Sequence, residues 1–386
     1  MGSWAIRGTR LHYNQSFSHT ASQELLLNIV RMRYGEVPTF LDLPNINSVM
    51  EAKVDGSGGQ LGDNLTQGVF GGLFGLRDEP TLAYQPRSGD NLAESLIQAL
   101  TAEILLDVPP GGDTRTFLLA FVDSINGVRN CPTATSLSSR VLQPNDDYRY
   151  AVDLVIGLQS RGAIKVRVGK QEEQAHDAIP VAAATGEDVV LAAKEGFVYD
   201  VFDERVRLVE RKRFVALAIQ PHELQAADLE EVVRLFHLEP GRSAYRIESQ
   251  ENVEVDLGSD EAIVGASQAA TDVITLNVRS GYQVLAFLSK GVDVPEPHVR
   301  RGTVHLFQGL DGRSFDGRQL TRGLFQVCVQ KHRPLRSDLA VHYRGYWFYI
   351  PESDVQSRAT LNQVKMAIDL QSQAGNAGPV LTLPLR

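Results

Sequence analysis

The sequence predicts an α+β fold, with mixed, largely antiparallel sheets and interspersed helices. Helix-like and strand-like apolar patterns are mixed along the whole chain, and most of them are short. Glycines end several of the helix-like segments before an extended segment begins, as at Gly35, Gly162 and Gly291. Because the units are short and close together, we expect many antiparallel pairings.

The first helix is expected to begin at Thr20 or Ser22, either of which can cap it, and to end at Gly35. Apolar residues recur at helical spacing through residues 25–32, which predicts a buried face. Pro38 prevents the helix from resuming, because proline lacks the backbone N–H. A buried helix followed by a strand is therefore predicted.

Residues 39–54 predict a strand pair or one long bent strand, with Pro44 at an edge or a bulge. The glycine-rich residues 55–75 predict a loop or a hairpin tip. The alternative, a phosphate-binding loop, needs a GxxxxGK[ST] motif or a helix directly after the glycines. Neither is present, so the nucleotide-binding interpretation is rejected.

The remaining elements follow from the same periodicities and stop signals. Helices are predicted at residues 90–100, 114–125, 148–160, 228–238, 280–290 and 355–368, the last capped by Ser353 or Asp354. Strands are predicted at residues 81–84, 164–168, 245–247, 273–278, 324–329 and 380–385, with two or three more between 189 and 220. Residues 340–350 predict a further strand, or a hairpin that turns at Arg344-Gly345.

The length of 386 residues suggests two or three domains of roughly 100–200 residues each. The segment at 130–145 is polar and irregular. It predicts a boundary between an N-terminal α+β domain at 1–135 and a C-terminal α+β region at 146–386. An acidic, loop-like stretch at 249–270 is a second place where the C-terminal region could divide.

The composition excludes several classes of protein. The formal net charge of -9 argues against nucleic acid as a partner, because phosphate binding needs a net basic face. Cys131 and Cys328 allow at most one intramolecular disulfide and no four-cysteine zinc site. No apolar run approaches the ~20 residues of a transmembrane helix.

No catalytic, metal or cofactor motif emerges from the sequence. It contains no HExxH, HxH, Cys-x-x-Cys or GxSxG pattern; the nearest approach to the last is residues 265–269, with alanine in place of the second glycine. His176-Asp177 and His222-Glu223 are expected to be solvated surface pairs. A catalytic Cys–His dyad that uses Cys131 or Cys328 remains an alternative. Cys328 lies in an apolar strand, which favours a buried and inert thiol. The sequence therefore predicts no catalytic residues, no metal and no cofactor.

Two clusters are candidates for binding. The first is basic and interleaves with Val206, Leu208 and Val209: its members are Arg205, Arg207, Arg211, Lys212 and Arg213. It is expected to be the solvent face of an amphipathic strand, with a site for acidic lipid headgroups, polysaccharide or an acidic partner as the alternative.

The second cluster is the aromatic stretch at 342–349. On a continuous strand, Tyr346 and Phe348 share one face and Trp347 and Tyr349 the other. One face is expected to join the core. The other is a candidate binding surface, because Tyr, Trp and Arg are enriched at interfaces. The predicted binding residues are Tyr343, Arg344, Tyr346 and Trp347.

Residues 14–41 resemble a group of bacterial envelope proteins, lipoprotein-like in character, that carry an LLLNIVRxRY helix followed by PxFL. Residues 79–86, 288–295 and 344–350 are similar to the same group. The resemblance implies an envelope protein with a lipid anchor. This chain shows neither a signal peptide nor a lipobox cysteine, so the anchor would belong to a segment upstream. The resemblance implies no activity and no catalytic residues.

Together these observations favour a non-enzymatic bacterial envelope protein that acts through protein–protein interaction or assembly, with a protein partner or further copies of itself. The alternatives are a carbohydrate- or lipid-binding module, or an enzyme without a recognisable motif. The expected location is the periplasm or the outer membrane surface, with the cytoplasm as the alternative.

Overall fold

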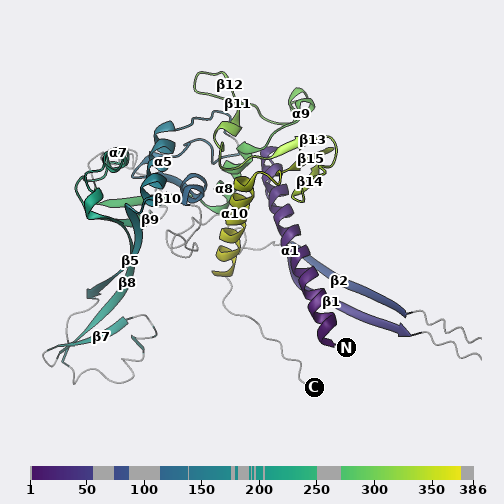
Figure 1. The fold of residues 1–386 in the computed structure, drawn as a ribbon, viewed down its shortest axis with the longest axis horizontal. Helices are drawn as coiled ribbons and strands as arrows, with labels where there is room; N and C mark the ends of the chain where they lie inside the picture. Colours follow the sequence, from purple (N-terminus) through teal and green to yellow (C-terminus); the bar gives the residue numbers. More distant parts are fainter. Residues whose placement is uncertain are drawn as a thin grey trace, which may run out of the picture.

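The computed structural model describes residues 2–54, 74–86, 114–137, 139–174, 179–180, 191–192, 194, 197–202, 205–249 and 271–374. It confirms the α+β class: helices pack around mixed sheets in which antiparallel pairs predominate (Figure 1). The predicted helix at 90–100, the predicted strand at 380–385 and the acidic stretch at 250–270 lie outside the described residues.

The first helix, α1 (Gly2–Arg33), is longer than predicted. It begins at Gly2 and runs through Thr20 and Ser22, so the predicted capping role of these two residues is wrong. Both hydroxyls donate to carbonyl oxygens one turn back, at 2.9 Å and 3.0 Å, as they do inside a helix. The C-terminal end is as predicted: Gly35 has φ +79°, a conformation that glycine adopts without strain.

Two long strands, β1 (Leu41–Val54) and β2 (Phe74–Pro86), follow as an antiparallel two-stranded sheet that extends away from the body (Figure 1). The structure confirms one long strand at 41–54 rather than a strand pair. The register shifts between Asp42 and Asn45, so Pro44 lies in a bulge, as predicted. The glycine-rich segment 55–73, which joins the two strands, lies outside the described residues.

The largest sheet has eight strands in the order β4-β3-β10-β9-β8-β5, with β6 and β7 also paired to β8. Its strands are β3 (Val122–Ile125), β4 (Val128–Arg129), β5 (Ile164–Gln174), β6 (Ile179–Pro180), β7 (Phe197–Phe202), β8 (Arg205–Ile219), β9 (Ala244–Ser249) and β10 (Val273–Val278). Only β9 and β10 pair in parallel among its described strands. The long β5–β8 pair and β7 leave the body as a second projection (Figure 1).

The remaining described elements cover this sheet or form the second half of the body. The helical ones are α4 (Thr114–Thr116), the π-helix η1 (Phe117–Phe121), α5 (Asp146–Ser160), η3 (Pro221–Glu223), α7 (Ala227–Leu235), α8 (Gly281–Leu288), η4 (Ser289–Gly291), α9 (Glu296–Arg300), η5 (Gly317–Gln319) and α10 (Val355–Ala374). The strands are β11 (Phe307–Gln308), β12 (Ser314–Phe315), β13 (Cys328–Gln330), β14 (Ala340–Tyr343) and β15 (Tyr346–Tyr349).

Two of the predicted elements are wrong in extent. The predicted helix at 114–125 ends at Phe121, because residues 122–125 form β3 and pair with β10. The predicted strand at 324–329 is reduced to β13, and Leu324 and Phe325 lie in a buried turn before it. A tertiary pairing overrides the local pattern in the first case, and in the second the Leu324 and Phe325 amides donate to the nearby Thr321 carbonyl instead of to a strand.

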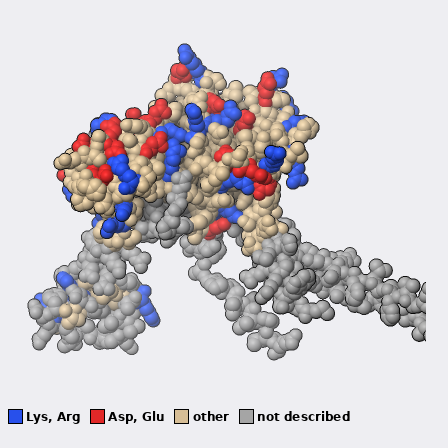
Figure 2. Space-filling view, viewed as in Figure 1, with Lys and Arg blue, Asp and Glu red and all other residues tan. Residues whose placement is uncertain are grey.

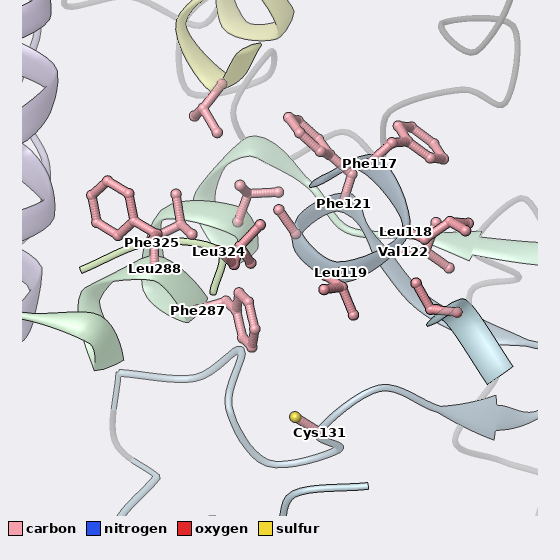
Figure 3. Close-up of a cluster of buried hydrophobic side chains, with 14 of the residues drawn as sticks. Phe117, Leu118, Leu119, Phe121, Val122, Cys131, Phe287, Leu288, Leu324 and Phe325 are labelled. Carbon is pink, nitrogen blue, oxygen red and sulfur yellow. The ribbon is translucent and has the colours of Figure 1, made fainter. Parts of the chain in front are cut away.

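The core is one continuous cluster centred on α8. Val284, Leu285 and Leu288 are fully buried, and helices α1 and α10 pack against α8. Figure 3 shows the side chains of η1 on one side of this cluster and those of Phe287, Leu288, Leu324 and Phe325 on the other. Each such buried leucine or valine stabilises the fold by ~1.5–3 kcal/mol relative to an exposed one. The cluster draws residues from both sides of the predicted boundary at 130–145.

Arg279 is a fully buried cation at the C-terminal end of η1. It donates to the Leu119 and Ala120 carbonyls at 3.1 Å and 3.0 Å and to the Asn130 carbonyl at 2.6 Å. Its guanidinium also lies 4.3 Å from the centre of the Phe287 ring. The last carbonyls of a helix lack partners within the helix, so the guanidinium satisfies them. Desolvation lowers the pKa of Arg279, and the nearby Asp123 carboxylate partly offsets this lowering.

Candidate functional site

The predicted aromatic segment forms a hairpin, as proposed from the sequence. Strands β14 and β15 are antiparallel and turn at Arg344 and Gly345, whose φ angles are +47° and +82°. Positive φ at both central residues is typical of a type I′ turn, which suits the twist of the flanking strands. Strand β13 pairs with the other edge of β15, so the hairpin belongs to a three-stranded sheet.

The sheet separates the four predicted binding residues. Phe348 is fully buried, which confirms that one face joins the core. Tyr343 and Tyr346 are register partners on that inner face, and Arg344 lies in the turn. Trp347 is paired with His342 on the outer face. The structure therefore brings Tyr343, Arg344 and Tyr346 together and places Trp347 on the opposite side.

On the inner side, Tyr34 at the end of α1 meets His298 of α9. The Tyr34 hydroxyl lies 2.7 Å from Nδ1 of His298, and the two rings pack edge to face. Tyr343 and Tyr346 complete the group, with ring centres 5.2 Å from Tyr34 and 5.0 Å from His298 respectively. His298 is 3% exposed, so this contact is closed to solvent.

Glu36 is the charged centre of the same cluster. Its carboxylate accepts hydrogen bonds from the Tyr343 hydroxyl at 2.5 Å, from Arg344 at 2.9 Å and from Arg31 at 3.2 Å. Burial opposes ionisation, but the hydrogen bonds from Tyr343, Arg344 and Arg31 outweigh it and lower the pKa of Glu36. The ionised carboxylate thus ties the hairpin turn to α1.

The electrostatics of this cluster favour a fixed structural role over proton transfer. Burial raises the pKa of Tyr34 and of Tyr343 to about 12. Burial, followed by the nearby Arg301 and Arg344, lowers the pKa of His298. At neutral pH the two phenols and the imidazole are neutral and Glu36 is ionised. A general acid or base works best with a pKa near the operating pH, and these four groups are shifted away from it.

The outer side of the sheet carries a different surface, formed by Trp347 and the loop at residues 331–336, which we call the basic loop. Its side chains are exposed at Lys331, His332, Arg333, Leu335 and Arg336. Arg333 lies over the Trp347 ring at 5.5 Å. Lys331, at the start of the loop, turns to the other face: it lies 4.5 Å from the centre of the Tyr346 ring and donates to the Gly345 carbonyl at 3.1 Å. Leu335 is 102% exposed, at the level of an unfolded chain.

The cations of the basic loop have no acidic partners among the described residues, which is also true of the exposed Arg129, Arg301 and Arg322. Within the described residues, no carboxylate forms an ion pair with Lys331, Arg333 or Arg336. The neighbouring acids are engaged elsewhere: Asp338 pairs with Arg358, and Glu36 pairs with Arg31 and Arg344. Elsewhere on the visible face, acidic and basic side chains are interspersed (Figure 2).

The other sequence candidates do not gather into a site. His176, Arg211, Lys212 and Arg213 fall where the structure describes no side chain, and His222 is 75% exposed beside Glu223. Arg205 and Arg207 lie on β8 on either side of the buried Val206, which agrees with an amphipathic strand.

The two cysteines are free thiols, so they do not pair. Burial raises the pKa of both Cys131 and Cys328, which disfavours the reactive thiolate. Across the described ranges, no three His, Cys, Asp or Glu side chains are grouped as a metal site would require.

The sequence predicted no site role for four residues: Tyr34, Glu36, His298 and a second buried cation, Lys290. Lys290 donates to the Ser136 carbonyl at 3.0 Å, and burial lowers its pKa to about 8. It is 3% exposed, so it is a partner of the core rather than of a ligand. No local pattern marks any of these residues, because their partners are distant in the chain.

Of the helices that the structure describes, none combines the length and apolar character needed to cross a membrane. Comparisons with protein-family models, with curated proteins and with solved structures find no match for this chain. The functional argument therefore depends on the chain's own surface.

Proposed function

We propose that this protein is a non-enzymatic binding protein that holds an acidic segment of a partner protein against Trp347 and the basic loop. The observation that carries the proposal is the pair of exposed cations of the basic loop, Arg333 and Arg336, that lack acidic partners within the described residues. The chain as a whole has a formal charge of -9, so a local basic surface is a departure from its average. An acidic partner would complement this surface and be drawn to it.

Apolar anchors accompany these charges. Leu335 stands fully exposed between the basic residues, and Trp347 is half-buried beneath Arg333. Interfaces derive most of their binding energy from a few buried anchors, with Trp and Arg enriched among them. An acidic segment with one or two apolar residues fits this combination better than a purely charged one.

The inner cluster supports the proposal by holding this surface in place. Glu36, Tyr343 and Arg344 tie the β14–β15 turn to α1, and Lys331 is tied to the same turn through Gly345. A surface that is already ordered loses less conformational entropy on binding. The envelope setting of this function rests on the sequence resemblance alone.

The test uses the tryptophan fluorescence of Trp347. The chain has two tryptophans, so a Trp4→Phe variant leaves Trp347 as the single reporter. We expect a peptide of glutamate, aspartate and leucine to shift its emission, and added salt to weaken the binding. Arg333→Glu with Arg336→Glu should weaken it by about tenfold, which corresponds to ~1.4 kcal/mol.

The matched control is Arg300→Glu with Arg313→Glu, which makes the same charge change at side chains that are 69% and 88% exposed. If this control weakens peptide binding equally, the loss of binding comes from the change in net charge, and the proposal is contradicted. So would the absence of any shift with the acidic peptide. Binding to vesicles with anionic headgroups, without binding to the peptide, would replace it with the lipid-binding alternative.

A further inference from the structure

The β1–β2 sheet has two open edges. Among the described strands, β1 pairs only with β2 and β2 only with β1, and the pair extends away from the body (Figure 1). An unpaired strand edge presents a row of N–H and C=O groups to any strand that approaches. An isolated two-stranded hairpin is also marginally stable in water, and further strands stabilise it.

We propose that this sheet continues from one molecule to the next, with the outer edge of β2 paired to the outer edge of β1 of a second copy of the chain. The inference does not rest on the proposed function, because it uses a different part of the molecule. It commits to a second copy because β1 and β2 already match one another within the chain. Their antiparallel register runs without a shift from Asn45↔Ala83 to Val54↔Phe74.

When that register is repeated between copies, each residue meets the same residue type that it meets within the hairpin. On one face it would align the positions of Ile46 with Leu82, Ala52 with Leu76 and Val54 with Phe74. The other face would align Asn47 with Thr81. The match is partial, because the same register opposes Val49 to Glu79 and Met50 to Asp78.

The charges at the register positions are complementary as well. Glu51 and Arg77 are register partners within the hairpin, and the same register would place Glu51 of the next copy beside Arg77. Opposite charges at directly opposed positions stabilise a strand pair, whereas like charges destabilise it.

Pro80 removes one backbone hydrogen-bond donor from this arrangement. It lies within the uninterrupted ladder opposite Ser48, so its nitrogen belongs to the outer edge of β2. That edge therefore offers one donor fewer, a loss of about one hydrogen bond among those of the junction. Because the pairing is head to tail, the two copies at the ends of an array each keep one open edge until a ring closes.

The first experiment measures the mass in solution by sedimentation over roughly a hundredfold range of protein concentration. We expect the wild-type chain to be larger than a monomer, and Glu51→Lys or Arg77→Glu alone to shift it towards the monomer. Mixing the two variants should restore the assembly, because each junction between unlike copies then pairs opposite charges. Each variant keeps its like charges at positions 51 and 77 of its own hairpin in the mixture. Recovery of the larger mass would therefore report the contact between copies and not the repair of the hairpin.

The matched controls are Glu296→Lys and Arg300→Glu, which reverse the charges of an exposed ion pair on α9 and should leave the mass unchanged. A wild-type monomer over the whole concentration range would overturn the proposal. Equal loss of mass in the α9 controls would overturn it too.

A cross-linking experiment covers the case in which the charge variants lose the hairpin itself. Asn47→Cys and Thr81→Cys are made separately in a Cys328→Ser background. Cα atoms of opposed antiparallel residues lie ~4.5–5.5 Å apart, which is within reach of a disulfide. A mixture of the two variants should form a disulfide-linked heterodimer, and neither variant should do so with itself. Cross-links that form only between like variants, or none at all, would contradict the pairing of β1 with β2.

Discussion

The hydrogen bond between Tyr34 and His298 joins residues that are 264 positions apart in the chain. It connects the end of α1 to α9, and the Glu36 carboxylate connects the same helix end to the β14–β15 turn. Both partners of the first bond are neutral near pH 7, because burial raises the pKa of Tyr34 and lowers that of His298. The contact is therefore sensitive to acid.

We predict that His298 makes the protein less stable as the pH falls through about 6.5, the ordinary pKa of histidine. Burial lowers the pKa of His298 in the folded state, with Arg301, Arg344 and Lys331 adding positive charge nearby. The unfolded chain then binds the proton more readily than the folded chain. Stability from this group is therefore complete above that pH and lost below it.

The measurement is the free energy of unfolding by urea at pH 7.5 and pH 5.5, for the wild type and for His298→Phe. The variant should show a smaller loss between the two pH values. Replacement of the exposed His222 by Phe is the control and should keep the wild-type difference. A pH dependence in His298→Phe equal to that of the wild type would contradict the prediction.

Glycines determine where several elements end or turn. Gly35, Gly162 and Gly345 all have positive φ, and each was expected from the sequence to end or turn an element. Gly157 differs, because it lies inside helix α5 with an ordinary backbone conformation and open space around its Cα. The two kinds of glycine should respond in opposite ways to the same substitution.

We predict that Gly345→Ala destabilises the protein by about 1 kcal/mol, because alanine is strained at φ +82°. Gly157→Ala should instead stabilise it by about 0.5–1 kcal/mol, because alanine has less freedom to lose in a helix. Urea unfolding of both variants beside the wild type measures the two changes. Effects of the same sign would show that the turn or the helix differs from this description.

Local signals predicted the elements whose boundaries depend on their own residues. Helix α5 was predicted from its apolar spacing and the stop at Gly162, and the hairpin turn from Arg344-Gly345, because these signals act within a few residues. The predicted helix at 114–125 failed after Phe121, where β3 pairs with β10 about 150 residues away. For the candidate site, the aromatic hairpin was predictable, whereas Tyr34, Glu36 and His298 were not.

At the scale of the whole molecule, β3 and η1 connect the two regions that the sequence divides at 130–145. Strand β3 pairs with β10, and the carbonyls of Leu119 and Ala120 accept hydrogen bonds from Arg279. A buried guanidinium without acceptors is costly, because neither water nor a carbonyl then satisfies its donors. These contacts cross the predicted boundary.

We predict that a fragment of residues 146–386 does not fold alone, since it retains Arg279 without the carbonyls of η1 and Asn130. Urea unfolding followed by circular dichroism should show no cooperative transition for the fragment and one for the intact chain. Addition of a fragment of residues 1–135 is the control and should restore the transition. A cooperative transition in the isolated fragment would support an independent domain.

The α+β class, the helix–glycine–strand units and the turn at Arg344-Gly345 were predictable from the residues alone. These depend on periodicity and on backbone conformations that individual residues favour, which act over a few residues. The face that Trp347 occupies, the partners of Arg279 and His298, and the strands with open edges became known from the folded chain. Such contacts join residues that are distant in the chain, so they leave no local pattern to read.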